Sequence, residues 1–353
     1  LSRQYRFKAR PWDLQRAPSV CTGCAVGCNI ELHARDHSLQ RMVPRENMAI
    51  NNEWLCDHGR FDTLPLGTER LREPSIDSQR ASWEQALDAA AKLLRTSGRA
   101  EIVASPSLTN EALNVLRAIA AGLGLPLTVW PAKAGKTRGS IADLVASTTI
   151  VLLSLDVWSE LPVLALRIRE ALTSGAKLYF VGTGSNGLAR DTAATFASAD
   201  ELLASGGEGL AGPVSILGVG AEDLAQRLEA TGLIGQPPSA ANGYAMAELP
   251  EASFRADALL LAGNEDWPAL DGKHAVQLRW AQPATSAGQA ILLPITHPYE
   301  QTGTVTNLEG RVQELRAGGK VADEAKPDWL ALAELARALG LAAPQEEPKA
   351  ALA

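Results

Sequence analysis

From about residue 65 onward, short apolar runs alternate with longer amphipathic stretches. The apolar runs are rich in Val, Ile, Leu and Ala and lie at 101–104, 127–130, 149–155, 177–181 and 214–218. The stretches between them are predicted helices, at 81–94, 110–123, 161–173 and 221–231. Apolar strands separated by amphipathic helices are typical of parallel sheets that are covered on both faces. The pattern therefore predicts an α/β fold with doubly wound, mostly parallel sheets.

Two local signals support particular helix ends. Ser82 stands directly before the apolar pattern of the first helix, where a serine can act as N-cap. Gly175 separates 161–173 from 177–181, at the position that a helix C-cap favours. The segment 149–181 is therefore predicted to form a strand–helix–strand unit.

A second set of elements follows residue 250. We expect strands at 256–262 and 290–295, a short helix at 275–280, a further segment at 303–315 and a last helix at 329–339. The final residues, 344–353, contain mainly Pro, Gln, Glu, Lys and Ala and are expected to be a disordered tail.

The first 64 residues have a different pattern from the rest. Their short polar segments predict strands and turns wrapped around a site, with one strand at 41–44 that ends at Pro44. The sequence thus predicts four parts: a small N-terminal domain at 1–64, a first αβ domain at 65–250, a second αβ segment at 251–343, and the tail.

Charge and hydropathy exclude two broad classes of function. The 353 residues carry 33 Lys and Arg against 40 Asp and Glu, a net charge of −7, with no basic stripe. This balance argues against a nucleic-acid partner. The apolar runs fall far short of the about 20 residues that span a bilayer, so no direct membrane span is expected, although docking onto a membrane complex is compatible with the sequence. The chain begins at Leu1 without a signal-peptide core, and we expect either a processed protein or an excised piece of a longer chain.

All four cysteines lie before residue 57, at Cys21, Cys24, Cys28 and Cys56. Their spacing, C-x2-C-x3-C-x27-C, gathers three thiolates within eight residues and adds a distant fourth, which is the ligand number of one [4Fe–4S] cluster. Gly23 and Gly27 are expected to let the loop turn tightly while its N–H groups approach the cluster. A structural zinc site would more often pair two C-x2-C knuckles, and two disulfides would need Cys21 and Cys24 to serve separate bridges from one turn. We therefore predict that these four cysteines bind iron in a cluster, with zinc as the alternative, and we predict no catalytic residue.

The other candidate residues give weaker signals. His58 and Arg60 follow Cys56 and either tune the cluster or hydrogen-bond nearby carbonyls, and the hydrogen-bonding role is favoured. The remaining histidines are expected to be surface residues or satisfied polar residues. Gly182-Thr-Gly184-Ser-Asn-Gly187 follows a predicted strand and matches G-x-G-x-x-G, with Asp200 downstream. A dinucleotide site needs a strand before that acid, and 193–203 is predicted to be helix or loop, so a vestigial crevice is favoured.

Two further motifs are discounted. Lys133-Ala-Gly-Lys136-Thr137 resembles part of a P-loop but lacks its first glycine. Asn264-Glu265-Asp266-Trp267 follows a predicted strand, and its acidic residues are expected to cap the next helix rather than bind a ribose.

Several segments resemble a known family. Residues 5–14, the cysteine segment 21–28, Pro44-Arg45-Glu46-Asn47 and 52–61 are similar to the large iron–sulfur subunit of bacterial NADH:quinone oxidoreductase (respiratory complex I). Residues 70–74, 81–87 and Gly303–Gln313 resemble the wider molybdopterin oxidoreductase superfamily. The resemblance implies that the αβ domains are of the molybdopterin oxidoreductase type, behind a small iron–sulfur domain.

The resemblance also carries implications for cofactor and partners. It implies that this chain is the C-terminal part of such a subunit, that Cys21, Cys24, Cys28 and Cys56 hold an extra [4Fe–4S] cluster off the main electron path, and that no molybdopterin is bound. Active relatives place a Lys or Arg just after the fourth cysteine. At that position this chain has His58, and no cysteine follows Cys56. The implied partners are other peripheral-arm subunits and the missing N-terminal iron–sulfur region, on the cytoplasmic side of the bacterial inner membrane.

The leading hypothesis is therefore a peripheral iron–sulfur subunit fragment that contributes to electron transfer from NADH to quinone without binding either substrate. Two alternatives stay open: a subunit of an active molybdopterin enzyme such as a formate dehydrogenase, and a structural zinc-binding interaction module.

Overall fold

The computed structural model describes residues 5–64, 69–131, 135–205, 210, 212–238, 240–268, 270–283, 287–319 and 324–344. Apart from residue 344, the predicted tail lies outside the described residues. No helix in these ranges is both long enough and apolar enough to cross a lipid bilayer.

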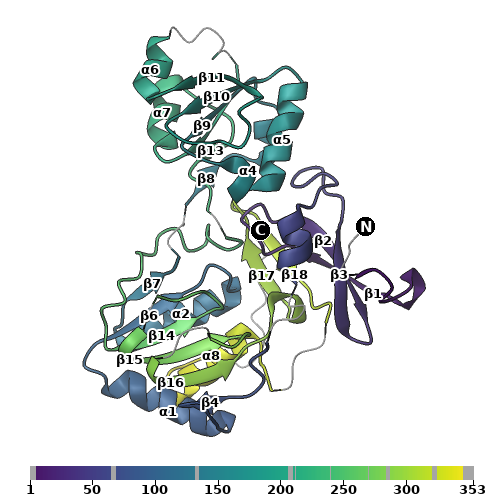
Figure 1. Ribbon diagram of the computed structural model, residues 1–353. Helices are drawn as coiled ribbons and strands as arrows, with labels where there is room; N and C mark the ends of the chain where they lie inside the picture. The colour runs from purple at the N-terminus through teal and green to yellow at the C-terminus, as the bar shows by residue number, and fades with distance from the viewer. Residues whose placement is uncertain are drawn as a thin grey trace.

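The N-terminal part folds into a three-stranded antiparallel sheet of order β1-β2-β3 (Figure 1). Its elements are η2 (Pro11–Asp13), β1 (Gln15–Val20), β2 (Asn29–Arg35), β3 (Ser38–Pro44) and the helical turn η3 (His58–Asp62). The strand expected at 41–44 is confirmed as the end of β3. Ile30, Leu32 and Met42 are fully buried, so this small domain has an apolar core beside its cysteines.

The middle of the chain forms a six-stranded sheet of order β11-β10-β9-β12-β13-β8, parallel except for β8. The strands are β8 (Thr137–Arg138), β9 (Thr149–Leu153), β10 (Lys177–Val181), β11 (Thr192–Phe196), β12 (Val214–Gly218) and β13 (Ile234–Gly235), and the helices are α3 (Ile141–Val145), α4 (Val157–Glu160), α5 (Pro162–Thr173), α6 (Ala199–Ala204) and α7 (Ala221–Leu228). The unit β9–α5–β10 confirms the predicted strand–helix–strand unit, and Gly175 follows α5 at φ 101°.

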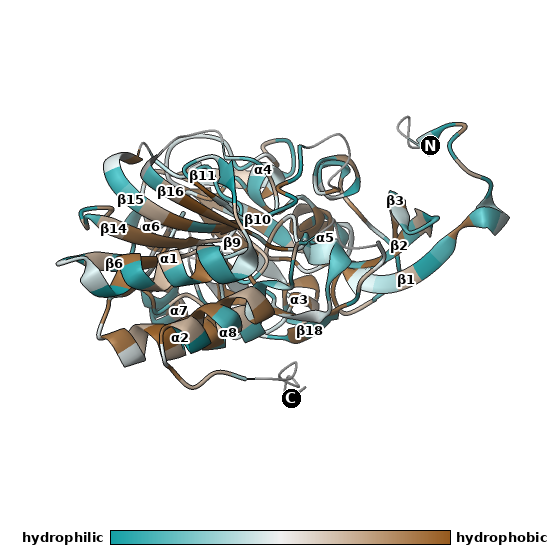
Figure 2. Cartoon of the chain, turned by 90° about the horizontal axis from the view of Figure 1, so that it is seen from below, coloured by the Kyte–Doolittle hydropathy of each residue, from teal (hydrophilic) through white to brown (hydrophobic). Residues whose placement is uncertain are grey.

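The third sheet has seven strands in the order β5-β4-β16-β15-β14-β6-β7, with parallel pairing from β16 to β7. The strands are β4 (Ser75–Ile76), β5 (Gln79–Arg80), β6 (Ala100–Ala104), β7 (Leu127–Val129), β14 (Ala258–Ala262), β15 (Leu270–Arg279) and β16 (Ala287–Pro294). Helices α1 (Trp83–Thr96), α2 (Asn110–Leu123) and α8 (Asp328–Ala338) pack together on one face, as Figure 2 shows from below. Ser82 accepts a hydrogen bond from the Gln85 N–H at the start of α1, which confirms the predicted N-cap.

The sheets differ from the sequence prediction in three places. The seven-stranded sheet takes strands from both 65–250 and 251–343, so residue 250 is not a sheet boundary, because local patterns do not reveal which strands pair. The short helix expected at 275–280 is wrong: residues 275–279 belong to β15, whose apolar positions are buried between β14 and β16. The helix or loop expected at 193–203 begins instead with strand β11, followed by α6.

A hairpin of β17 (Gly303–Thr306) and β18 (Val312–Leu315), preceded by η4 (Pro298–Glu300), lies between the three sheets (Figure 1). It is hydrogen-bonded to the part of the chain that each sheet belongs to. The Thr304 N–H donates to Glu111 of α2 at 2.8 Å, the Glu309 carboxylate accepts from the Ile141 N–H at the start of α3 at 2.8 Å, and the Arg316 N–H donates to Ser19 of β1 at 3.2 Å. The hairpin therefore joins all three parts of the protein.

Candidate metal centre

The four predicted ligands come together in one cavity. Cys21, Cys24 and Cys28 lie on the cysteine loop (residues 21–28) that joins β1 to β2, and Cys56 lies directly before η3. With Gly23, Gly27, His58 and Gly59 they line a small cavity, which we call the cysteine cavity. All four are free thiols; the three loop cysteines are buried and Cys56 is partly buried.

Backbone geometry explains how the loop holds its three cysteines close together. The Cys21 N–H donates to the Cys28 carbonyl at 2.8 Å and closes the loop at its base. Gly27 has φ +69°, and a Cβ there would stand only 2.0 Å from Gln313 Oε1. The predicted need for glycine at this position thus has two physical causes, the left-handed backbone and the close approach of the hairpin.

Burial makes the cavity unfavourable for bare thiolates. Burial, together with the charge of neighbouring cysteines, raises the pKa of Cys21 to about 11 and that of Cys24 to about 12. The Gly23 N–H faces the Cys21 sulfur at 3.5 Å and the Gly59 N–H faces the Cys56 sulfur at 3.3 Å. Four thiolates in this space require cations to compensate their charge, which is what iron–sulfur ligation supplies. The donor set thus fits a cluster. Within the part of the chain that is described, no three His, Cys, Asp or Glu side chains are arranged to hold a single metal ion.

A buried tyrosine that sequence reasoning missed stands behind Cys21. Tyr299 of η4 is fully buried; its hydroxyl lies 3.0 Å from Thr63 Oγ1, accepts the Thr22 N–H at 3.2 Å, and is 3.9 Å from the Cys21 sulfur. It is 278 residues from Cys21 in sequence, and no local motif marks it. The ring of His297 lies 5.0 Å from that of Tyr299, and burial, together with the charge of Arg70, lowers the pKa of His297 to about 3, so its imidazole is neutral.

The predicted residues beside Cys56 have different surroundings. His58 lines the cysteine cavity but is more than half exposed, and its Nδ1 lies 3.1 Å from an Asp62 carboxylate oxygen. Its partner is thus a side chain and not the carbonyl that was expected. Among the other histidines, His33 is buried between Glu31 and Arg41, whereas His274 is exposed.

The nucleotide-like motifs do not form a site of their own. Gly182, Gly184 and Gly187 follow β10 as predicted, and all have positive φ. Asp200, however, lies in the first turn of α6 and pairs with Arg227 at 2.6 Å on the surface. In the segment that resembles a P-loop, Lys133 lies outside the described residues.

The expectation that 264–267 caps a helix is wrong, because the element that follows is strand β15. Asn264 instead accepts the Ala281 N–H at 2.9 Å. Glu265 accepts hydrogen bonds from Ser105 and Ser107, and burial raises its pKa.

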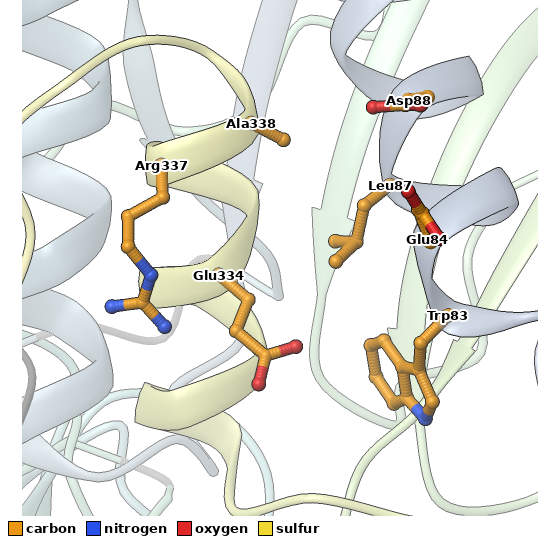
Figure 3. A pocket seen from close by; sticks show the side chains of 7 residues that line it. All are labelled: Trp83, Glu84, Leu87, Asp88, Glu334, Arg337 and Ala338. Carbon is orange, nitrogen blue, oxygen red and sulfur yellow. The ribbon is translucent and has the colours of Figure 1, made fainter.

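A separate surface groove lies between α1 and α8 (Figure 3). Trp83 and Leu87 point into it from α1, and the charged side chains Glu334 and Arg337 line it from α8. Glu334 is paired with Lys326. The groove is built from other elements than the cysteine cavity and contains none of the predicted ligands.

Comparisons with known proteins match two segments of the chain to described families. Residues 14–63 match "NADH-ubiquinone oxidoreductase NDSU1/NuoG-like, 4Fe-4S domain", which includes all four cysteines. Residues 276–338, from β15 to α8, match "Molybdopterin oxidoreductase". A 4Fe-4S domain and a molybdopterin oxidoreductase domain are therefore present, as the sequence resemblance implied.

Curated relatives extend the match to nearly the whole chain. The NADH-ubiquinone oxidoreductase 78 kDa subunit of Candida albicans is 26% identical over 98% of this chain and 55% of its own length. NADH-quinone oxidoreductase subunit 3 of Thermus thermophilus is 28% identical over 96% of this chain and 53% of its own length. An NADH-quinone oxidoreductase subunit of Streptomyces coelicolor is 36% identical over 31% of this chain and 14% of its own length. The chain spans about half the length of the two relatives that it matches over nearly all its residues.

Solved structures support the fold assignment. Acetylene hydratase from Pelobacter acetylenicus has a TM-score of 0.63 at 13% identity, over 92% of this chain and 69% of that one. A chain of the formyltransferase/hydrolase complex from Methylorubrum extorquens has a TM-score of 0.52 at 18% identity, over 75% of this chain and 98% of that one. At these identities the likeness concerns the fold alone.

Proposed function

We propose that this chain is part of the large iron–sulfur subunit of an NADH:quinone oxidoreductase, in which Cys21, Cys24, Cys28 and Cys56 hold one [4Fe–4S] cluster. The observation that carries the proposal is that four cysteines, the last of them 28 residues after the third, line one cavity within a segment that matches a NuoG-like 4Fe-4S domain. When bound, the cluster supplies a centre that takes up and releases one electron.

The residues of this chain have separate roles around such a cluster. The four thiolates bind iron, the N–H groups of Gly23 and Gly59 face the sulfurs of Cys21 and Cys56, and the hydroxyl of Tyr299, which is bonded to Thr63, lies against the Cys21 sulfur. The αβ domains form a scaffold of the molybdopterin oxidoreductase type that carries no molybdopterin. This part of the proposal rests on His58 in place of Lys or Arg and on the lack of any cysteine after Cys56.

The partners and the placement within the cell are a further part of this proposal. We propose that the partners are other subunits of the peripheral arm together with an N-terminal iron–sulfur region, on the cytoplasmic side of a bacterial inner membrane, and that the cluster lies off the main electron path. The exposed Phe7 and Trp12, beside Arg6, Lys8 and Arg10, offer an aromatic and basic contact surface for such a partner.

Metal analysis of the anaerobically reconstituted chain tests the proposal. We expect about four irons and four sulfides per chain, with an electron paramagnetic resonance (EPR) signal after reduction. Zinc in place of iron would support an interaction module, and molybdenum or tungsten would support an active molybdopterin enzyme. A chain that takes up no iron under these conditions would refute the assignment.

A further inference from the structure

Three consecutive carbonyls of the cysteine loop are hydrogen-bonded by one element, the β17–β18 hairpin. The Leu308 N–H donates to the Ala25 carbonyl at 2.7 Å. Asn307 Nδ2 donates to the Val26 carbonyl at 3.4 Å, and Gln313 Nε2 donates to the Gly27 carbonyl at 2.9 Å. The hairpin therefore determines how three successive peptide planes of this loop are turned.

Two of these three peptides turn their opposite ends toward cysteine sulfurs. In a trans peptide the C=O of one residue and the N–H of the next point in opposite directions. Carbonyls held by the hairpin thus direct the N–H groups of Val26, Gly27 and Cys28 away from it. The hydrogen bond from the Val26 N–H to the Cys24 sulfur lowers the pKa of Cys24 against the rise that burial causes, and the Cys28 N–H likewise bonds the Cys28 sulfur.

The orientation of the Gln313 amide is fixed by its surroundings. Its Nε2 also lies 3.3 Å from Asn29 Oδ1, and that oxygen already accepts from Asn47. The reverse orientation would set Gln313 Oε1 against two acceptor oxygens. In the observed orientation Oε1 is buried and has no hydrogen-bond partner among the described residues. A buried acceptor left unpaired costs free energy, but the two acceptor oxygens that face Nε2 favour the observed orientation, with its donor contact to the Gly27 carbonyl.

The geometry points to the hairpin as the element that tunes the cluster: we propose that Gln313 sets the reduction potential by holding the Gly27–Cys28 peptide with its N–H group toward the Cys28 sulfur. This inference rests on the proposed function, because it needs a cluster in the cysteine cavity. Gln313 touches the loop backbone and not the sulfurs, so it is a positioning residue.

The sign of the effect follows from charge. Reduction adds one electron, so the cluster and its thiolates become more negative, and N–H groups that face the sulfurs stabilise this state and raise the potential. A hydrogen bond to the carbonyl end of a peptide also polarises its N–H end and makes it a better donor. Removal of the Gln313 donor must therefore lower the potential.

The test compares Gln313→Met with Gln301→Met in the full chain, anaerobically reconstituted. Methionine keeps the length of the side chain but has no donor. Gln301 is a matched control because it is also a buried glutamine of the same segment, and its amide contacts Thr296 and Asp328 instead of the cysteine loop. Each protein is titrated with a chemical reductant at controlled potential while the EPR signal is recorded, and its iron and sulfide are counted.

We expect Gln313→Met to keep its iron and to show a several-fold lower ratio of reduced to oxidised cluster at a fixed potential, where tenfold corresponds to 59 mV for one electron. Gln301→Met should titrate like the unaltered chain. An unchanged potential in Gln313→Met with full iron content would overturn the inference and leave the proposed function standing, whereas an unaltered chain without iron would refute the proposed function.

A second variant keeps the test decisive if Gln313→Met loses its iron. Gln313→Glu has almost the same shape and replaces the donor by an acceptor, so we expect it to titrate at a lower potential than the unaltered chain. Loss of iron from both variants, with Gln301→Met intact, would refute tuning and show that the hairpin only holds the loop together.

Discussion

Replacing Gly27 by alanine should destabilise the cysteine loop through two separable effects. Gly27 has φ +69°, and a left-handed backbone costs a residue with a Cβ about 1–2 kcal/mol. In addition, the Cβ would stand 2.0 Å from Gln313 Oε1 and 2.9 Å from Asn307 Cβ, so the hairpin must move. Forcing an extra carbon into a packed site costs about 1–3 kcal/mol, which gives about 2–5 kcal/mol together.

Gly124 offers a control that isolates the backbone effect. It has φ +64° at the C-cap of α2, and a Cβ there would meet nothing within 4 Å. Gly124→Ala should therefore cost only the conformational part, about 1–2 kcal/mol. The difference between the two variants measures how closely the hairpin presses on the loop.

Urea unfolding of the reconstituted proteins checks this difference with two signals. The visible absorption of the cluster follows the cysteine cavity, and far-ultraviolet circular dichroism follows the helices. At a slope of about 3 kcal/mol per M, the visible transition of Gly27→Ala should move down by about 1 M urea, while Gly124→Ala should move mainly the helical transition. If both variants shift the visible transition equally, the proposed contact between the loop and the hairpin is refuted.

Three further changes have expected outcomes. Cys24→Ser should hold fewer than four irons and give no cluster EPR signal, because one ligand is lost; full iron content would contradict the ligand assignment. Burial raises the pKa of Glu265 above its unfolded value, so its carboxyl stabilises the fold only below that pKa and loses this contribution as pH rises; Glu265→Gln should raise the urea midpoint more at pH 8 than at pH 4, and equal gains would refute this. Arg70 binds Glu300 through two hydrogen bonds of 2.7 and 2.6 Å in a buried setting; Arg70→Met should cost about 3–5 kcal/mol, and Glu300→Gln in the same chain should recover part of it.

The sequence was most informative where a signal is local. The unit β9–α5–β10 could be predicted because its strands and helix follow one another and the chain turns at a glycine. The four cysteines could be identified because three of them stand within eight residues. In both cases the residues that carry the signal are close in sequence to those that they contact.

Prediction failed where the determining contacts are distant. Residues 275–279 form a strand because β14 and β16 pair with them on either side, and a short stretch of sequence does not reveal such pairing. Tyr299 contacts Cys21 and Gln313 contacts Gly27, although more than 270 residues separate the members of each pair. Their positions are set by the hairpin, and no spacing rule connects a buried tyrosine or glutamine to a cysteine motif.

The cysteine loop depends on the αβ scaffold for its hydrogen bonds. The carbonyls of Ala25, Val26 and Gly27 receive their donors from the hairpin, and the same hairpin is bonded to α2 and α3. Without it, three peptide groups at the base of a buried cavity would lose these partners, at a cost of about 1–3 kcal/mol each where they stay out of water. The scaffold thus has a physical role in the metal centre that does not depend on any ligand of its own, which is a reason for such domains to persist beside a cluster.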